Sequence, residues 1–109
     1  MTLHELKLNS RFFDAVLNKI KTFEVRKDDR GFRVGDTLML SEVDDSGRYI
    51  KKLDNALTAY KRSDRIIVAK VTYVLTSEDF PEAIREGYAI LGIEVSCDEW
   101  DWNGRKARE

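Results

Sequence analysis

Alternation of apolar and polar residues predicts five short strands along this chain. The first covers residues 4–8, and the others cover residues 21–26, 37–43, 65–75 and 88–95. A period of two buries one face of each strand and leaves the other in solvent. The stretch at 65–75 is the longest and is rich in β-branched side chains, so we expect it at the centre of a sheet.

A helix is predicted directly after the first strand, and Asn9 or Ser10 can cap its N-terminus. Five apolar residues then fall on one side of that helix: Phe12, Phe13, Val16, Leu17 and Ile20. A second short helix is expected over residues 78–86, because Pro81 is tolerated in a first turn. Leu53, Leu57 and Tyr60 can belong to a third helix or to a loop, and we treat residues 44–64 as an insertion.

These elements predict an α+β fold, a small twisted mixed β-barrel of five to six strands with two or three short helices. At 109 residues the chain has room for one domain, because two separate cores would each be too small to offset chain entropy. We place this domain at residues 1–97. Residues 98–109 then form a polar tail that contains Trp100 and Trp102.

Composition and charge narrow the possible functions. The chain is 42% hydrophobic and 36% charged, which is enough apolar material for a folded core. The formal net charge of −1 gives no overall attraction to nucleic acid or to a membrane. Basic residues gather only locally, in a solvated loop or a polyanion site: Arg48, Lys51, Lys52, Lys61, Arg62 and Arg65.

Several kinds of chemistry are disfavoured. The chain has one cysteine, Cys97, which excludes an internal disulfide and a multi-cysteine zinc site. A Ser-His-Asp triad would have to use the one histidine, His4, and no serine lies in a nucleophile-elbow motif. Glycine-rich phosphate loops, signal segments and membrane spans are absent from the sequence. We therefore expect no metal, no cofactor, no membrane partner and a cytoplasmic location.

The strand at residues 21–26 is the best candidate for a site. Its side chains divide between two faces: Thr22, Glu24 and Arg26 on one, and Lys21, Phe23 and Val25 on the other. A carboxylate beside two cations can accept a hydrogen bond from a base or an amide while the cations hold an anion. A ladder of structural ion pairs across strands explains the same pattern equally well.

The same segment resembles the ASCH superfamily of PUA-like domains. Its Gly-x-Lys-x-x-Glu-x-Arg motif is matched by Lys21, Glu24 and Arg26, while Lys19 replaces the glycine, so the helix-to-strand turn can differ in shape. Residues 29–30, 34–36 and 87–94 add to the likeness. The opening residues 4–7 most resemble DUF3850, a subfamily of phages and bacteria, and the likeness covers most of residues 3–95.

The resemblance implies a barrel with a cleft that binds RNA or a nucleotide. The implied binding residues are Lys21, Thr22, Glu24, Arg26 and Arg30. Glu24 would read a base amino group, while Arg26 and Arg30 would contact phosphate. An exposed aromatic residue such as Phe32 or Tyr60 would stack on a base.

Two alternatives remain open. Some small ASCH proteins are amidohydrolases that deacylate N4-acetylcytidine with a lysine, a threonine and a glutamate, which makes Lys21 and Glu24 catalytic candidates. Here Glu24 takes the threonine's position, and only one short segment can supply the glutamate, from Glu78, Glu82 or Glu86. The other alternative is a phage accessory protein that binds a host protein, for which Trp100 and Trp102 are the candidate contacts.

Overall fold

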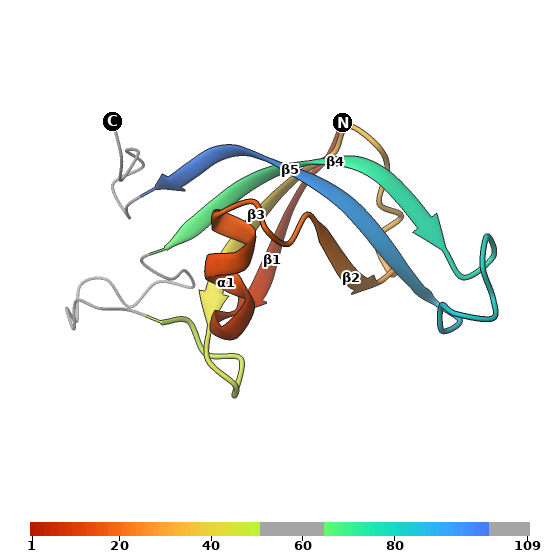
Figure 1. Ribbon diagram of the computed structural model, residues 1–109, viewed down its shortest axis with the longest axis horizontal. Helices are drawn as coiled ribbons and strands as arrows, with labels where there is room; N and C mark the ends of the chain where they lie inside the picture. Colours follow the sequence, from red (N-terminus) through yellow and green to blue (C-terminus); the bar gives the residue numbers. More distant parts are fainter. Residues whose placement is uncertain (51–64, 101–109) are drawn as a thin grey trace.

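A curled, five-stranded sheet and one helix make up the part of the chain that the structure describes. The structure is a computed structural model and describes residues 1–50 and 65–100, the last four through their backbone alone. Its elements are β1 (Leu3–Asn9), α1 (Ser10–Leu17), β2 (Phe23–Lys27), β3 (Thr37–Val43), β4 (Ile66–Thr76) and β5 (Tyr88–Trp100) (Figure 1). The predicted α+β class is confirmed, as a half-barrel rather than a closed ring of strands.

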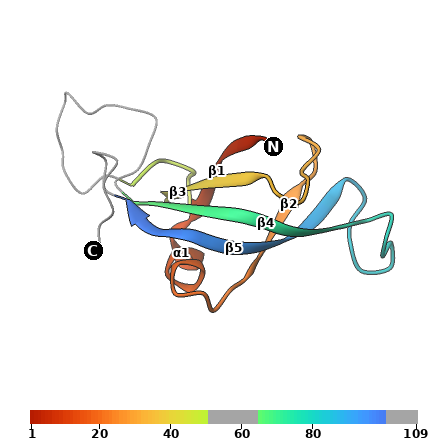
Figure 2. The ribbon, with the colours of Figure 1, turned by 90° about the horizontal axis from the view of Figure 1, so that it is seen from above.

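The strands lie in the order β1-β3-β4-β5-β2. β1 runs parallel to β3, and every other neighbouring pair is antiparallel. β4 is central, as its β-branched sequence predicted, while β1 and β2 are the two edges. The sheet arches over α1 in Figure 1, and Figure 2 shows the helix on one side of the sheet, next to β5.

The predicted alternation builds the core between the sheet and the helix. Residues of β1 alternate between exposed and buried, and Phe13 and Val16 of α1 are fully buried against the strands. The Asn9 side chain caps α1 by accepting a hydrogen bond from the Arg11 backbone N–H at 3.0 Å, so the predicted cap is confirmed. The cap turns the chain from the β1 edge toward the core.

One predicted helix is absent, and two strands have other ends than predicted. Residues 77–87 form turns instead of a helix, because the Ile84 N–H to Phe80 carbonyl bond closes one turn that is not continued, and Ile84 alone of this segment is buried. β2 starts at Phe23 and not at Lys21, and β5 continues past residue 95 to Trp100. Leu53, Leu57, Tyr60 and most of the predicted tail, with Trp102, lie outside the described residues.

His4 takes part in a buried hydrogen-bond cluster around Asp36 that anchors β1. The Asp36 carboxylate accepts from the Thr2 and Arg33 backbone N–H groups at 3.1 and 3.0 Å and lies 2.9 Å from His4 Nε2. The hydrogen bond with His4 is the main reason that the pKa of Asp36 is lowered from 3.8 to about 2. His4 also packs against Phe32, with ring centroids 4.7 Å apart.

We predict that this cluster makes stability depend on pH in acid. The folded state keeps Asp36 ionised down to about pH 2, whereas the unfolded chain protonates it near 3.8. Its contribution is therefore complete above pH 3.8 and is lost as the pH falls to about 2. Asp36→Asn should lower the free energy of unfolding at neutral pH by about 1–3 kcal/mol, because hydrogen bonds to a charged acceptor are lost.

Urea unfolding of the wild type and of Asp36→Asn across this pH range checks the prediction. The difference in unfolding free energy should shrink as the pH falls through the window from 3.8 to about 2. A difference that stays constant down to the lowest pH would show that the Asp36 charge does not contribute.

Candidate functional site

The segment between α1 and β2 begins with a left-handed turn at Lys19. Lys19 has a φ of 63° and is the one residue other than glycine with a positive φ in the described ranges. The Lys19 N–H donates to the Val16 carbonyl at 3.0 Å and the Ile20 N–H donates to the Ala15 carbonyl at 2.9 Å, which is a Schellman ending of the helix. Glycine favours this conformation, so the lysine adopts the turn that glycine would form most easily.

Beyond this turn, the three charged residues of the motif meet at Glu24. Glu24 is 3% exposed. Its Oε1 accepts from Lys21 Nζ at 2.7 Å, and its Oε2 accepts from Arg26 Nε at 3.1 Å and Nη2 at 2.9 Å. The expectation that Lys21 lies on the opposite face from Glu24 is wrong, because Lys21 precedes β2 and its side chain is free to reach back to the carboxylate.

Both oxygens of the buried carboxylate are therefore occupied by cations. A buried charge without partners is costly, and two cations offset the cost of desolvating Glu24. The cluster carries two positive charges and one negative charge, so an excess positive charge remains for an anion. The geometry makes Glu24 the residue that positions Lys21 and Arg26, and each of its oxygens accepts at least one hydrogen bond from them.

Arginine side chains also span the gap between the two edges of the sheet. Arg26 of β2 donates through Nη2 to the Lys7 carbonyl of β1 at 2.6 Å, and Arg30 donates through Nη1 to the Glu5 carbonyl at 3.4 Å. β1 pairs with β3 alone, so these carbonyls lie on its outer edge. The side chains that carry the positive charge thus also hold the half-barrel in its curled shape.

Two phenylalanine rings flank the Lys21 ammonium. Lys21 Nζ lies 4.7 Å from the ring centroid of Phe23 and 5.4 Å from that of Phe12. Phe12 is 37% exposed and Phe23 is 45% exposed. The expectation of an exposed Phe32 is wrong, because this ring is buried beside His4, and Tyr60 lies outside the described residues.

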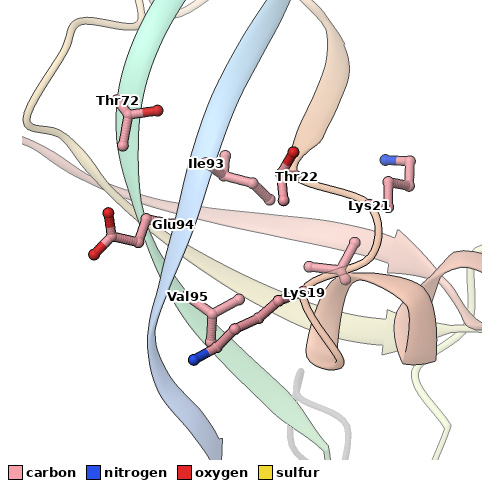
Figure 3. A pocket seen from close by; sticks show the side chains of 8 residues that line it. Lys19, Lys21, Thr22, Thr72, Ile93, Glu94 and Val95 are labelled. Carbon is pink, nitrogen blue, oxygen red and sulfur yellow. The ribbon is translucent and has the colours of Figure 1, made fainter.

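A pocket opens next to this cluster, between the end of α1 and β5 (Figure 3). Its volume is ≈ 410 Å³. The residues that line it come from α1, the connecting segment, β4 and β5: Val16, Lys19, Lys21, Thr22, Thr72, Ile93, Glu94 and Val95. Of the predicted site residues, Thr22 therefore belongs to this pocket, and Lys21 borders both the pocket and the Glu24 cluster.

The other predicted residues lie apart from the cluster. Glu78, Glu82 and Glu86 are exposed in the turns that precede β5. Lys27, the last residue of β2, pairs with Tyr88, the first residue of β5, so these turns lie beyond the end of β2 that is farther from Lys21. In the basic stretch, Arg48 lies 3.6 Å from Asp44 and Arg65 lies 2.6 Å from Asp14, and the members between them lie outside the described residues.

The described ranges contain no group of three or more metal-binding side chains and no helix long and apolar enough to cross a membrane.

Comparison with known proteins assigns a family. Residues 3–93 match the family described as a domain of unknown function, DUF3850. This chain belongs to the DUF3850 family. The match runs from the start of β1 into β5, so it includes the Lys21, Glu24 and Arg26 cluster, and it confirms the resemblance that the opening residues suggested.

The DUF3850 chain is also similar to a phage protein. It is 50% identical over 40 residues to an uncharacterized 12.9 kDa protein in the GpA 3′ region of Escherichia phage P2. The aligned stretch spans 37% of this chain and 37% of that protein.

The left-handed turn predicts an unusual response to substitution. Lys19→Gly should raise the free energy of unfolding by about 1 kcal/mol, because glycine adopts a positive φ without the clash that a Cβ creates. The neighbouring Asn18→Gly is the matched control, since Asn18 has a φ of −84° and gains nothing from glycine. Urea unfolding of both variants tests this, and a loss of stability in Lys19→Gly would contradict it.

Proposed function

We propose that this DUF3850 protein binds single-stranded RNA through the Lys21, Glu24 and Arg26 cluster and the two phenylalanine rings beside it. One observation carries the proposal: two half-exposed rings, Phe12 and Phe23, lie against an ammonium in a cluster with excess positive charge. Proteins bind single-stranded nucleic acid with aromatic side chains, which stack on the bases, and with nearby cations, which contact the charged phosphate groups.

The outer face of the sheet supports the stacking part of the proposal. Phe23 of β2 and Tyr73 of β4 both pair with Gly92 of β5, so the two aromatic side chains lie on one face with a glycine between them. Tyr73 is 63% exposed. A base stacked on either ring contributes about 1–3 kcal/mol.

The phosphate part of the proposal rests on Lys21, Arg26 and Arg30. The Lys21 and Arg26 side chains keep 18% and 20% of their surface exposed although both bind Glu24. The Arg30 side chain is 46% exposed and forms a long ion pair, 3.9 Å, with Asp29. Lys21 and Arg26 both bind Glu24, and the side chains of Arg26 and Arg30 both reach β1. A nucleic-acid backbone that follows the gap between β2 and β1 would therefore contact Lys21, Arg26 and Arg30.

The hydrolase alternative has weaker support. A lysine that acts as a base must give up its proton, whereas Lys21 donates to the Glu24 carboxylate and to the Phe23 carbonyl at 2.6 Å. The candidate glutamates lie at the far end of β2. Incubation with N4-acetylcytidine, analysed by chromatography, tests this alternative, and turnover that disappears in Lys21→Ala would establish it. Binding to a host protein stays a prediction, because the Trp100 and Trp102 side chains lie outside the description.

Titration of a fluorescent single-stranded RNA, followed by anisotropy, tests the binding proposal. Phe23→Ala should weaken binding roughly 5- to 100-fold, because a stacked base is lost. Val25→Ala is the matched control: Val25 lies on the same face of β2, is 55% exposed and should leave affinity unchanged.

Salt concentration and strand type complete the experiment. Affinity should rise as salt is lowered, since phosphate contacts release counterions. Absence of binding at low salt would refute the proposal, and equal losses in Phe23→Ala and Val25→Ala would refute stacking. Tighter binding of DNA than of RNA would reassign the ligand.

A further inference from the structure

The pocket beside α1 contains an ammonium and a carboxylate that have no ion pair among the described residues. Within the described residues, the side chains of Lys19 and Glu94 form no ion pair and no hydrogen bond, although both line the pocket. Its volume of ≈ 410 Å³ falls within the range of small-molecule sites. In Figure 3, Lys19 extends along the pocket toward Val95, on the side away from the Lys21 ammonium.

The backbone of Lys19 is strained, because its φ is positive. A non-glycine residue in the left-handed region costs about 1–2 kcal/mol, and such strain concentrates at functional sites. Glycine would form this turn without that cost but would leave the pocket without an ammonium. The strained residue is therefore the one that supplies the pocket with its uncommitted positive charge.

Two hydroxyl groups complete the polar wall. Thr22 and Thr72 both line the pocket, and Figure 3 shows their side chains on either side of β5. Thr72 lies close over Gly92, where an added Cβ would approach Thr72 Oγ1 to 2.9 Å. The absence of a side chain at Gly92 thus leaves room for the Thr72 hydroxyl.

The charge balance of the pocket favours an anion at Lys19. The Lys21 charge is offset by Glu24, and Lys70 is the direct cross-strand partner of Glu94, which places a cation next to that acid. Lys19 remains as a cation with no acid bound to it in the described part of the chain. Glu94 remains an acceptor for a hydroxyl or an amino group.

We propose that this pocket binds the phosphate group of a nucleotide. Lys19 pairs with the phosphate, and the Thr22 and Thr72 hydroxyl groups and the Glu94 carboxylate form hydrogen bonds with the rest of the nucleotide. The proposal deepens the RNA-binding function and rests on it for the identity of the ligand. Because Lys21 borders both sites, a nucleotide stacked on Phe23 can place its phosphate here.

The test compares uridine 5′-monophosphate, uridine and inorganic phosphate by NMR titration of backbone amides. The wild type should bind the monophosphate more tightly than uridine, and inorganic phosphate alone should shift the amides of Thr22, Thr72 and Glu94. Lys19→Gly should weaken monophosphate binding at least roughly tenfold and leave uridine binding unchanged, since a charge-assisted contact is lost. Lys19→Arg, which keeps the positive charge, should retain most of the wild-type affinity for the monophosphate.

Loss of fold cannot explain such a result, because Lys19→Gly is expected to be more stable than the wild type. Lys27→Ala is the charge control: Lys27 is exposed near the far end of β2 and its removal should change nothing. Equal monophosphate affinity in Lys19→Gly and in the wild type, or no phosphate-induced shift at the pocket amides, would overturn the proposal.

The two proposals fail in different ways. Phosphate-induced shifts that Lys19→Gly abolishes, in a protein that binds neither RNA nor uridine, would support the phosphate site and refute RNA binding. RNA binding that depends on Phe23 and leaves the pocket amides and Lys19→Gly unaffected would refute the phosphate site alone.

Discussion

The ion-paired carboxylate of Glu24 is the constraint on which the rest of the site depends. A carboxylate that is 3% exposed must have partners, and β2 is too short to bring both of them from its own inner face. One partner, Arg26, comes from the strand, and the other, Lys21, comes from the segment before it. The cluster therefore ties the end of α1 to the edge of the sheet and fixes the positions of two cations.

The same cluster links the shape of the sheet to its function. Arg26 binds Glu24 and also the Lys7 carbonyl, so the guanidinium connects the two edge strands of the half-barrel. A group that carries positive charge for a ligand thus also covers the edge of β1, which would otherwise present unpaired carbonyl groups. Loss of the cluster should disturb charge, curvature and edge protection together.

The segment from Lys19 to Glu24 serves two adjacent surfaces. Its first residue projects into the pocket between α1 and β5, and its last residue turns inward to the core side of β2. The left-handed turn at Lys19 makes this change of direction possible within a few residues. Stacking and phosphate binding are therefore proposed on surfaces that share Lys21.

Sequence patterns predicted the strands and the charged motif well, because both depend on short-range periodicity. The sequence located β3 without error, and the length and β-branched residues of β4 placed that strand at the centre. The predictions failed where an element is not continuous. Alternation extended β2 back to Lys21, which the turn after α1 prevents. A proline suited to a first helical turn suggested a helix in residues 78–86, where Ile84 alone is buried and one turn forms.

The other features of the site depend on contacts between distant segments, which one sequence does not encode in its spacing. Phe32 resembles a surface aromatic residue in a charged loop, yet it packs on His4, which lies in β1. Phe12 and Phe23 meet at Lys21 only because the turn folds α1 back toward β2. The lysine in place of the motif glycine at Lys19 drew attention to the helix-to-strand turn, but no pattern in the sequence pointed to the pocket beside it.

The central claim is that Glu24 and Arg26 act as a coupled pair, and a double-mutant cycle tests it most directly. The free energies of unfolding of Glu24→Gln, Arg26→Gln and the double variant would be measured by urea denaturation. A coupling energy of about 1–3 kcal/mol is expected, because either single change removes the ion pair between the buried carboxylate of Glu24 and the guanidinium of Arg26. Additive effects would show that the two side chains stabilise the fold independently and would contradict the account.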